Sequence, residues 1–245
     1  NSTLFPHNIG LAASRNSELA YTIAKITAKE VRASGIRWNF DPVLGVGRQP
    51  LWSRFEETYG EDPLLVTEFG IQAIKGYEGD NLKSNINVAS CMKHFLGYSV
   101  SASGKDRTPA YISDMMLQDI YIPPFKKAVE SGASTIMINS GSINGTPVHI
   151  NKYLLTDLLK NEWGFEGLIV TDWLDIQYLY TQHNVAKDTK EAVKLAVNAG
   201  IDMSMVPFDL SFYNDLIELV SEGEVSMDRI DDAVSRILKV KFDLG

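Results

Sequence analysis

Residues 164–173 read GFEGLIVTDW, in which a short apolar run leads to a carboxylate beside an indole. The run Leu168-Ile169-Val170 is continuously apolar, as in a strand that is buried on both faces of a parallel sheet. Gly164 stands where a preceding helix would end. The stretch therefore predicts one helix-to-strand step of an α/β fold, with Asp172 and Trp173 at the carboxyl end of the strand.

The same step recurs along the chain, because helical spacing of apolar residues is repeatedly followed by a glycine and a short apolar run. The pair Pro123-Pro124 must kink or split one of the predicted helices. The pattern predicts helices over residues 16–34, 63–76, 113–131, 151–163, 187–199, 208–221 and 226–241. It predicts strands over residues 36–46, 88–94, 134–139, 168–172 and 201–205.

Alternating helices and buried strands fit either a (β/α)8 TIM-like barrel or a doubly wound sheet. No Gly-x-Gly-x-x-Gly follows the first strand, and the glycines of LGVGRQP (44–50) precede an arginine and a proline instead of a helix. The pattern thus favours the barrel. About five clear strands, where a full barrel needs eight, predict an incomplete barrel whose early strands are absent. Without a Pro/Gly/Ser-rich linker, residues 1–245 are expected to form a single, partial domain.

The amino-acid composition makes some classes of binding partner improbable. The chain of 245 residues has 23 Lys and Arg against 31 Asp and Glu, a formal charge of −8. Such an acidic surface repels phosphates, which disfavours nucleic acid and anionic membranes as partners. No apolar run approaches the roughly 20 residues of a membrane span. The lone Cys91 excludes an internal disulfide, and four histidines without ligand spacing indicate no metal; no cofactor is expected.

Polar residues at strand ends are the candidates for chemistry, because barrels and open parallel sheets carry their working residues there. The carboxylate, the indole and the Lys-His pair, with arginines at 48, 54 and 107, suit a neutral polyhydroxyl ligand. The sequence contains no Gly-x-Ser-x-Gly motif, so it gives no indication of a serine hydrolase. The strand-end candidates are Asp41, Lys93, His94, Asn139, Ser140, Asp172, Trp173 and Asp202.

Structural interpretations compete for each candidate. Asp172 could cap the helix-like stretch WLDIQYL, and Trp173 could belong to the core. The Lys-His pair could be a solvated strand end. Asp41, which precedes a proline, is expected to be structural, and Asp202 is expected either to be structural or to support the site residues from behind.

Seven ordered motifs resemble the catalytic barrel of family 3 glycoside hydrolases, especially the β-glucosidases and exo-acting β-glucanases. The resemblance runs almost end to end, and the order of the motifs makes it specific. The motifs are LFPHNIGLAAS (4–14), FDPVLGVGRQPLWSRFEETYGEDP (40–63), CMKHFLGY (91–98), SGKDRTPAYIS (103–113), YIPPFKKAVESGASTIMINSGSING (121–145), GFEGLIVTDW (164–173) and AGIDMSM (199–205).

The resemblance implies a role for five residues in a retaining hydrolase of terminal β-glucosidic bonds. Asp172 is similar to the catalytic nucleophile of the family, which forms a covalent glycosyl-enzyme. Lys93 and His94 match the pair that binds sugar hydroxyls in the innermost subsite. Arg54 matches the arginine that grips the same sugar, although Ser53 replaces the usual preceding glycine. Trp173 resembles the aromatic wall of the subsite.

The resemblance also implies that the general acid/base lies outside this chain. In the glucosidase branch this group is a glutamate on a C-terminal α/β domain that follows the barrel. The loop over residues 97–111 lacks the histidine of the N-acetylglucosaminidase branch. Its only carboxylate, Asp106, is expected to form a structural ion pair with Lys105 or Arg107. A sugar-binding aspartate of the family precedes LFP and is also absent, so the barrel is expected to be cut at both ends.

The expected substrate is a β-glucoside or β-glucan oligosaccharide, and relatives are often secreted or periplasmic. Two other hypotheses remain open at this point. The chain could bind sugar without turning it over, because its acid is missing. Alternatively, Lys93 could form a Schiff base in an aldolase-like barrel, since it ends an apolar strand.

Overall fold

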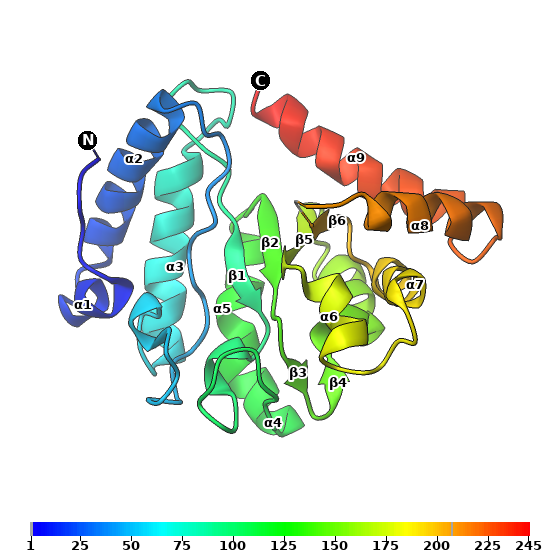
Figure 1. Cartoon of the computed structure of the whole chain (residues 1–245). Helices are drawn as coiled ribbons and strands as arrows, with labels where there is room; N and C mark the ends of the chain where they lie inside the picture. The colour runs from blue at the N-terminus through cyan, green and yellow to red at the C-terminus, as the bar shows by residue number, and fades with distance from the viewer. Residues whose placement is uncertain (1, 207) are drawn as a thin grey trace.

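The structure, a computed structural model, describes residues 2–206 and 208–245. Its central sheet has four parallel strands in the order β1 (Met92–Phe95), β2 (Thr135–Ile138), β5 (Leu168–Trp173) and β6 (Met203–Met205). The strands follow one another in the sheet as they do in the sequence (Figure 1). This order, with a crossover before each new strand, is the arrangement of a (β/α) barrel.

A fifth segment lies beside β1 at the edge of the sheet. Trp38 pairs with Ala89 and Val43 pairs with Lys93, both in parallel. The Lys93 amide donates to the Pro42 carbonyl at 2.9 Å. Pro42 has no amide hydrogen, so it cannot continue the ladder as a donor. The predicted strand over residues 36–46 is therefore present as an irregular edge segment instead of a regular strand.

The sheet does not close on itself within the described residues, which confirms the prediction of an incomplete barrel. A two-stranded hairpin of β3 (Ser142–Ile143) and β4 (Thr146–Pro147) follows β2. The α-helices are α1 (Asn8–Ala13), α2 (Ser17–Ala33), α3 (Pro63–Glu78), α4 (Asp114–Met116), α5 (Ile122–Glu130), α6 (Asp175–Thr181), α7 (Thr189–Ala199), α8 (Ser211–Ser221) and α9 (Met227–Asp243). Segments of π-helix span Leu117–Tyr121 and Tyr153–Glu162, and single 3₁₀ turns span Phe55–Glu57, Tyr98–Val100 and Val148–Ile150.

The local signals for helix ends are confirmed. The helix predicted over residues 113–131 is split into α4, a π turn and α5, and α5 has proline in its first turn. Proline fits there because a first-turn amide has no partner within the helix. The Asn16 side chain caps α2 by accepting from the Glu18 amide. Gly200 ends α7 with a φ of 125°, a conformation that L side chains rarely adopt.

The two faces of the sheet pack differently. Ile136, Ile138 and Ile169 face the helix layer and belong to the main hydrophobic core. The opposite face has a smaller layer of Met137, Val170 and their buried neighbour Cys91. Alternate residues of a strand point to opposite faces, so β2 and β5 supply both layers. The second layer corresponds to a barrel interior.

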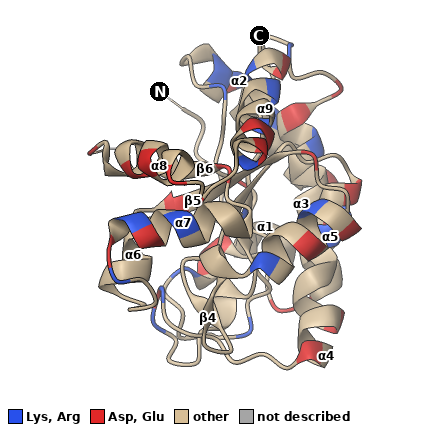
Figure 2. Ribbon diagram, turned by 90° about the vertical axis from the view of Figure 1, so that its right-hand side faces the viewer, with Lys and Arg blue, Asp and Glu red and all other residues tan. Residues whose placement is uncertain are grey.

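The outer faces of the helices carry the charges. Figure 2 shows acidic and basic residues interspersed on α7. Lys190 of this helix pairs with Glu218 at 2.9 Å and with Glu222 at 2.8 Å. Exposed pairs of this kind contribute little to stability. Among the described residues, no helix combines the length and the apolar character that crossing a membrane requires.

Candidate active site

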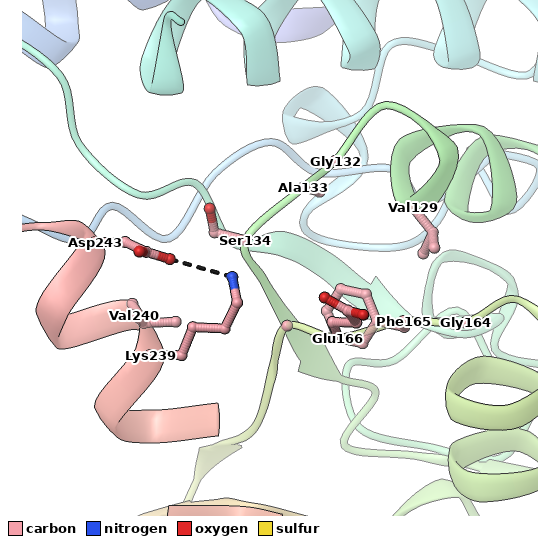
Figure 3. A pocket seen from close by; sticks show the side chains of 11 residues that line it. Val129, Gly132, Ala133, Ser134, Gly164, Phe165, Glu166, Lys239, Val240 and Asp243 are labelled. Atoms are coloured by element: carbon pink, nitrogen blue, oxygen red, sulfur yellow. Dashed lines mark hydrogen bonds and ion pairs between the residues drawn. The ribbon is translucent and has the colours of Figure 1, made fainter. Parts of the chain in front are cut away.

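The candidate site lies at the carboxyl ends of the strands, on the side of the β3–β4 hairpin in Figure 1. Helix α9 crosses the opposite end of the sheet, where its Val240 packs against Leu168 at the start of β5. A hollow of about 240 Å³ is found at that opposite end, beside Ser134 and Gly167 (Figure 3). Its charged lining includes an exposed pair, Lys239 and Asp243, 3.2 Å apart. The polar strand-end residues are gathered at the other end, which is the working end of a barrel.

Asp172 is presented at the end of β5 with 13% of its side chain exposed. The Trp173 amide donates to Asp172 Oδ1 at 2.6 Å. Helix α6 begins after Leu174, whose φ is 60°, and no side chain caps its first turn. The interpretation of Asp172 as a helix cap is therefore wrong. The carboxylate is instead fixed at the mouth of the sheet by its own backbone.

Two of the predicted sugar-binding residues form a chain of contacts that leads to Asp172. His94 Nε2 lies 3.6 Å from Asp172 Oδ2, and an Arg54 guanidinium nitrogen lies 3.3 Å from the same ring nitrogen. Glu57 holds the other side of Arg54 through two contacts of 2.8 and 2.9 Å. The Arg54 guanidinium also lies over the Tyr98 ring, 5.6 Å from its centroid. Segments 40 residues apart are thus brought to one carboxylate.

The buried His94 ring is neutral. Burial, together with the positive charges of Arg54, Lys93 and Arg107, lowers the pKa of His94 well below its usual value. Its contact with Asp172 is therefore not an ion pair, and 3.6 Å is too long for a hydrogen bond. Nδ1 of the ring has no hydrogen-bond partner among the described residues. With 1% of its side chain exposed, the neutral ring lies beside Asp172 without supplying a positive charge to it.

A second carboxylate, Asp175, stands behind Asp172. Arg107 bridges the two: its guanidinium lies 3.5 Å from Asp172 Oδ1 and 2.5 Å from Asp175 Oδ1. The Ser140 hydroxyl donates to Asp175 Oδ2 at 2.7 Å and lies 3.4 Å from Asp172 Oδ2. The Asp175 side chain is only 1% exposed. The two carboxylates therefore share the same two donors, one from the loop after β1 and one from the end of β2.

Burial, reinforced by the negative charge of Asp172, raises the pKa of Asp175 to about 7. Arg107 and Ser140 oppose this shift but do not cancel it. The folded state thus holds a proton on Asp175 at pH values where the unfolded chain has released it. Stability from this group is present at low pH and is lost as the pH rises toward 7.

Asp175→Asn should therefore gain stability relative to the parent protein as the pH increases. Between pH 5 and pH 8 the difference in unfolding free energy should change by about 2 kcal/mol in favour of the variant. Denaturant melts at both pH values measure this change. Asp209→Asn is the matched control, because Asp209 is an exposed carboxylate whose pKa is lowered by Ser211, so its titration ends below this range. A constant difference between Asp175→Asn and the parent would contradict the assignment.

Lys93 is the predicted site residue that lies outside this group of contacts. The half-buried Lys93 lies near Asp41, where burial raises the carboxyl pKa while the Tyr77 hydroxyl and the Lys93 charge oppose that rise. Tyr77 donates to Asp41 at 2.8 Å, which accounts for Asp41 as a structural residue. Within the described part of the chain, the Lys93 ammonium has no ion pair or hydrogen bond. It remains available to a ligand.

Trp173 presents part of its ring to solvent beside the carboxylate, with 41% of the residue exposed. Its ring meets Phe208 edge to face, with centroids 5.5 Å apart. Phe208 is 76% exposed. An exposed aromatic face at this position can cover the apolar face of a sugar.

Of two further acidic residues, Asp106 differs from the expectation and Asp202 agrees with it. The expected ion pair of Asp106 is wrong: the carboxylate accepts from the Trp52 indole at 3.0 Å, and Arg107 turns to Asp172 and Asp175. Asp202 is at the amino end of β6, where it accepts from Lys160 at 2.7 Å. It is structural, as expected. Across residues 2–206 and 208–245, no three His, Cys, Asp or Glu side chains are grouped so that they could hold a metal ion.

The structure thus places Asp172, His94, Arg54 and Trp173 together, and sets Lys93 beside Asp41. Asp175, which lies in the stretch WLDIQYL, was not among the predicted site residues. The signal was weak, because an acidic residue in a first helical turn is ordinary. In the sequence, Arg107 is one of several arginines, and Ser140 is one of several polar residues at strand ends. Neither is singled out by its neighbours.

Comparisons with known proteins agree on one family. The sequence model described as "Glycosyl hydrolase family 3 N terminal domain" matches residues 1–240. A lysosomal beta glucosidase of Dictyostelium discoideum is 50% identical, over 100% of this chain and 30% of its own length. A periplasmic beta-glucosidase of Salmonella typhimurium is 35% identical, over 99% of this chain and 31% of its own. The chain thus spans about a third of the length of these curated relatives.

A solved structure extends the likeness to the fold. The crystal structure of beta-glucosidase from Listeria innocua in complex with glucose superposes with a TM-score of 0.95 at 32% identity. The match covers 99% of this chain and 34% of that one.

Proposed function

This chain belongs to glycosyl hydrolase family 3, and we propose that residues 1–245 form, as one domain, the incomplete catalytic barrel of a retaining β-glycosidase. It acts on terminal β-glucosidic bonds, with a β-glucoside or short β-glucan as substrate. Asp172 is the nucleophile. Relatives named beta-glucosidase, and an exo-1,3/1,4-beta-glucanase at 37% identity with a TM-score of 0.90, support this class of substrate.

One observation carries the proposal: an accessible carboxylate stands at the carboxyl end of β5 among cationic and donor groups. Asp172 is open enough to meet a sugar carbon, with 13% of its side chain exposed. The Arg107 guanidinium lies 3.5 Å from its Oδ1, and the Ser140 hydroxyl lies 3.4 Å from its Oδ2. A positive charge and a hydrogen-bond donor beside an exposed carboxylate suit a nucleophile.

The reaction has two displacements at the anomeric carbon. An Asp172 oxygen attacks that carbon, the bond to the leaving oxygen breaks, and the leaving oxygen takes a proton from a general acid. Water then attacks the same carbon, the resulting base takes the proton of the water, and the Asp172 carboxylate is released. The product keeps the β configuration because two inversions cancel.

The general acid/base comes from outside these 245 residues. Asp175 is near enough to share Ser140 with Asp172, but Arg107, Ser140 and His149 enclose it and leave it 1% exposed. A glycosidic oxygen cannot reach such a group. Asp106 is bound to the Trp52 indole. Relatives about three times as long have room for a further domain that carries the acid.

Four residues hold the sugar around Asp172. Arg54 and the neutral His94 form the chain of contacts that leads to the carboxylate, and Trp173 follows the carboxylate in the sequence with 41% of the residue exposed. Lys93, which belongs to β1, binds hydroxyl groups of the same sugar. Charged donors bind neutral hydroxyl groups by charge-assisted hydrogen bonds, whereas the indole covers the apolar face.

A 2-deoxy-2-fluoro β-glucoside with a good leaving group tests the proposal. The fluorine slows hydrolysis of the intermediate, so one sugar should accumulate on each protein molecule. Peptide mass spectrometry should find it on Asp172. Borohydride with a carbonyl substrate should leave Lys93 unmodified, which separates this proposal from a Schiff-base aldolase. Labelling at another residue would remove Asp172 as the nucleophile.

Lys93→Ala is expected to lower kcat/KM for an aryl β-glucoside by about 10- to 100-fold. The reason is the loss of hydrogen bonds between a charged donor and the sugar, each of which contributes about 1.5–3 kcal/mol. Steady-state kinetics on the protein that carries this chain measure the effect. Lys190→Ala, on the outer face of α7, is the control and should leave kcat/KM unchanged. Equal rates for Lys93→Ala and the parent would show that this ammonium does not touch the sugar.

A further inference from the structure

We propose that Asp175 is a positioning residue for Asp172: it holds Arg107 and Ser140 so that each faces one oxygen of the Asp172 carboxylate. The inference rests on the proposed role of Asp172 as the nucleophile and deepens it. Asp175 is enclosed and does not touch the substrate, so its effect passes through the two residues that it holds.

The first connection is through Arg107, whose backbone has a φ of 57° in the loop after β1. Its shorter contact, 2.5 Å, is with Asp175, and its longer one, 3.5 Å, is with Asp172. Asp175 is therefore the anchor of the guanidinium. The Tyr178 ring lies 5.5 Å from the centre of the same guanidinium and supports it from helix α6. Without Asp175 the long side chain is free to leave Asp172.

The second connection is through Ser140. A serine hydroxyl has one proton to donate, and here it is 2.7 Å from Asp175 Oδ2 and 3.4 Å from Asp172 Oδ2. The charge on Asp175 therefore decides where that proton points. An ionised Asp175 attracts it, whereas a protonated Asp175 can donate to the Ser140 oxygen and leave the proton for Asp172. Both oxygens of the nucleophile thus depend on the state of Asp175.

The groups around Asp175 leave few other charges that could take over this role. Asp172 faces it from β5, Arg107 from the loop after β1, and His149 from the turn after β4, with His149 Nε2 at 3.4 Å from Oδ2. Burial lowers the pKa of His149 to about 3, so the ring is neutral. His183 Nε2 lies 3.2 Å from the Ser140 carbonyl and helps to fix that residue. Arg107 is therefore the only cation in contact with Asp175 among the described residues.

The rate of labelling by the 2-fluoro glucoside tests the inference, because it reports the attack by Asp172 alone. In the protein that carries this chain, Asp175→Asn should slow labelling by about 10- to 100-fold, the usual effect of losing an outer partner of an active group. Glucose affinity should stay within about twofold, since no sugar contact is lost. Asp209→Asn, an exposed carboxylate bonded to Gln177 and Ser211, should behave as the parent.

The pH dependence separates positioning from a general loss of structure. The labelling rate of the parent should change around pH 7, where Asp175 titrates, and Asp175→Asn should lack this inflection. Ser140→Ala should slow labelling too, and its effect should not add to that of Asp175→Asn, because the loss of Asp175 already removes the Ser140 connection. These results would support the inference even if one of the variants were less stable.

Two outcomes overturn it. Asp175→Asn could label at the rate of the parent, or it could label slowly and keep the inflection near pH 7. Either result removes the positioning role and leaves Asp172 as the nucleophile. If the parent itself is never labelled at Asp172, the proposed function fails as well, so the two failures are distinguishable.

Discussion

Asp172→Ala is expected to lower kcat/KM for aryl β-glucosides by about 10⁴- to 10⁶-fold, as the loss of a covalent nucleophile does in other enzymes. The fold should survive, because the contacts of Asp172 are with its own backbone and with polar groups at the mouth of the sheet. Removing a charge that raises the pKa of Asp175 also relieves a repulsion. Steady-state kinetics and thermal melts on the same preparation measure both effects.

Azide provides the sharper test of the same variant. The space left by the carboxylate can admit this small anion, which would attack the anomeric carbon from the face that Asp172 occupied. A single inversion then converts a β-glucoside into an α-glucosyl azide, and the aryl leaving group departs with the bonding electrons. Asp209→Asn serves as the control with full activity and no azide product. Normal hydrolysis by Asp172→Ala would exclude Asp172 as the nucleophile.

Residues 1–245 expressed alone are expected to catalyse only half of the reaction. Loss of a general acid/base typically lowers the rate by a factor of about 10² to 10⁴. The loss is largest for substrates with a poor leaving group. A 2,4-dinitrophenyl β-glucoside needs no protonation, so it should release about one equivalent of phenol and leave a sugar on Asp172. An alkyl β-glucoside should not be cleaved. A stopped-flow burst and the protein mass measure this outcome.

The controls separate a catalytic half from a protein that only binds sugar. The same 245 residues with Asp172→Ala should give no burst, while calorimetry should still detect glucose binding in the unaltered chain. Absence of a burst from a folded, glucose-binding chain would favour a role in binding only. Sustained turnover of an alkyl glucoside would show that the acid lies within these residues.

The architecture was predictable because its signals are local. Gly164 and Gly200 follow the ends of helices, the pair Pro123-Pro124 lies in the first turn of α5 where a longer helix is split, and Leu168-Ile169-Val170 forms a strand, each for reasons confined to neighbouring residues. The position of Asp172 follows directly from the last of these. The segment at 36–46 was harder to predict, since its pairing depends on β1 and its proline interrupts the ladder.

The arrangement of side chains around Asp172 was only partly predictable. His94 and Lys93 are neighbours in the sequence, yet His94 is buried against Asp172 while Lys93 lies near Asp41. The register of β1 with β2 shifts between Met92 and Phe95, so simple alternation does not assign the faces. Asp106 and Arg107 look like an ion pair in the sequence, but each has a different partner across the site.

By itself the sequence determined the succession of helices and strands, the incomplete barrel and the carboxylate at the end of β5, because periodicity, turn residues and motif order act over short distances. Only the tertiary structure decided that a second carboxylate, Asp175, stands behind Asp172 and shares Arg107 and Ser140 with it. Arg107 and Asp175 are 68 residues apart in the chain. No local pattern specifies such a contact; it arises when parallel strands bring their carboxyl ends to one edge and burial makes each charge find a partner.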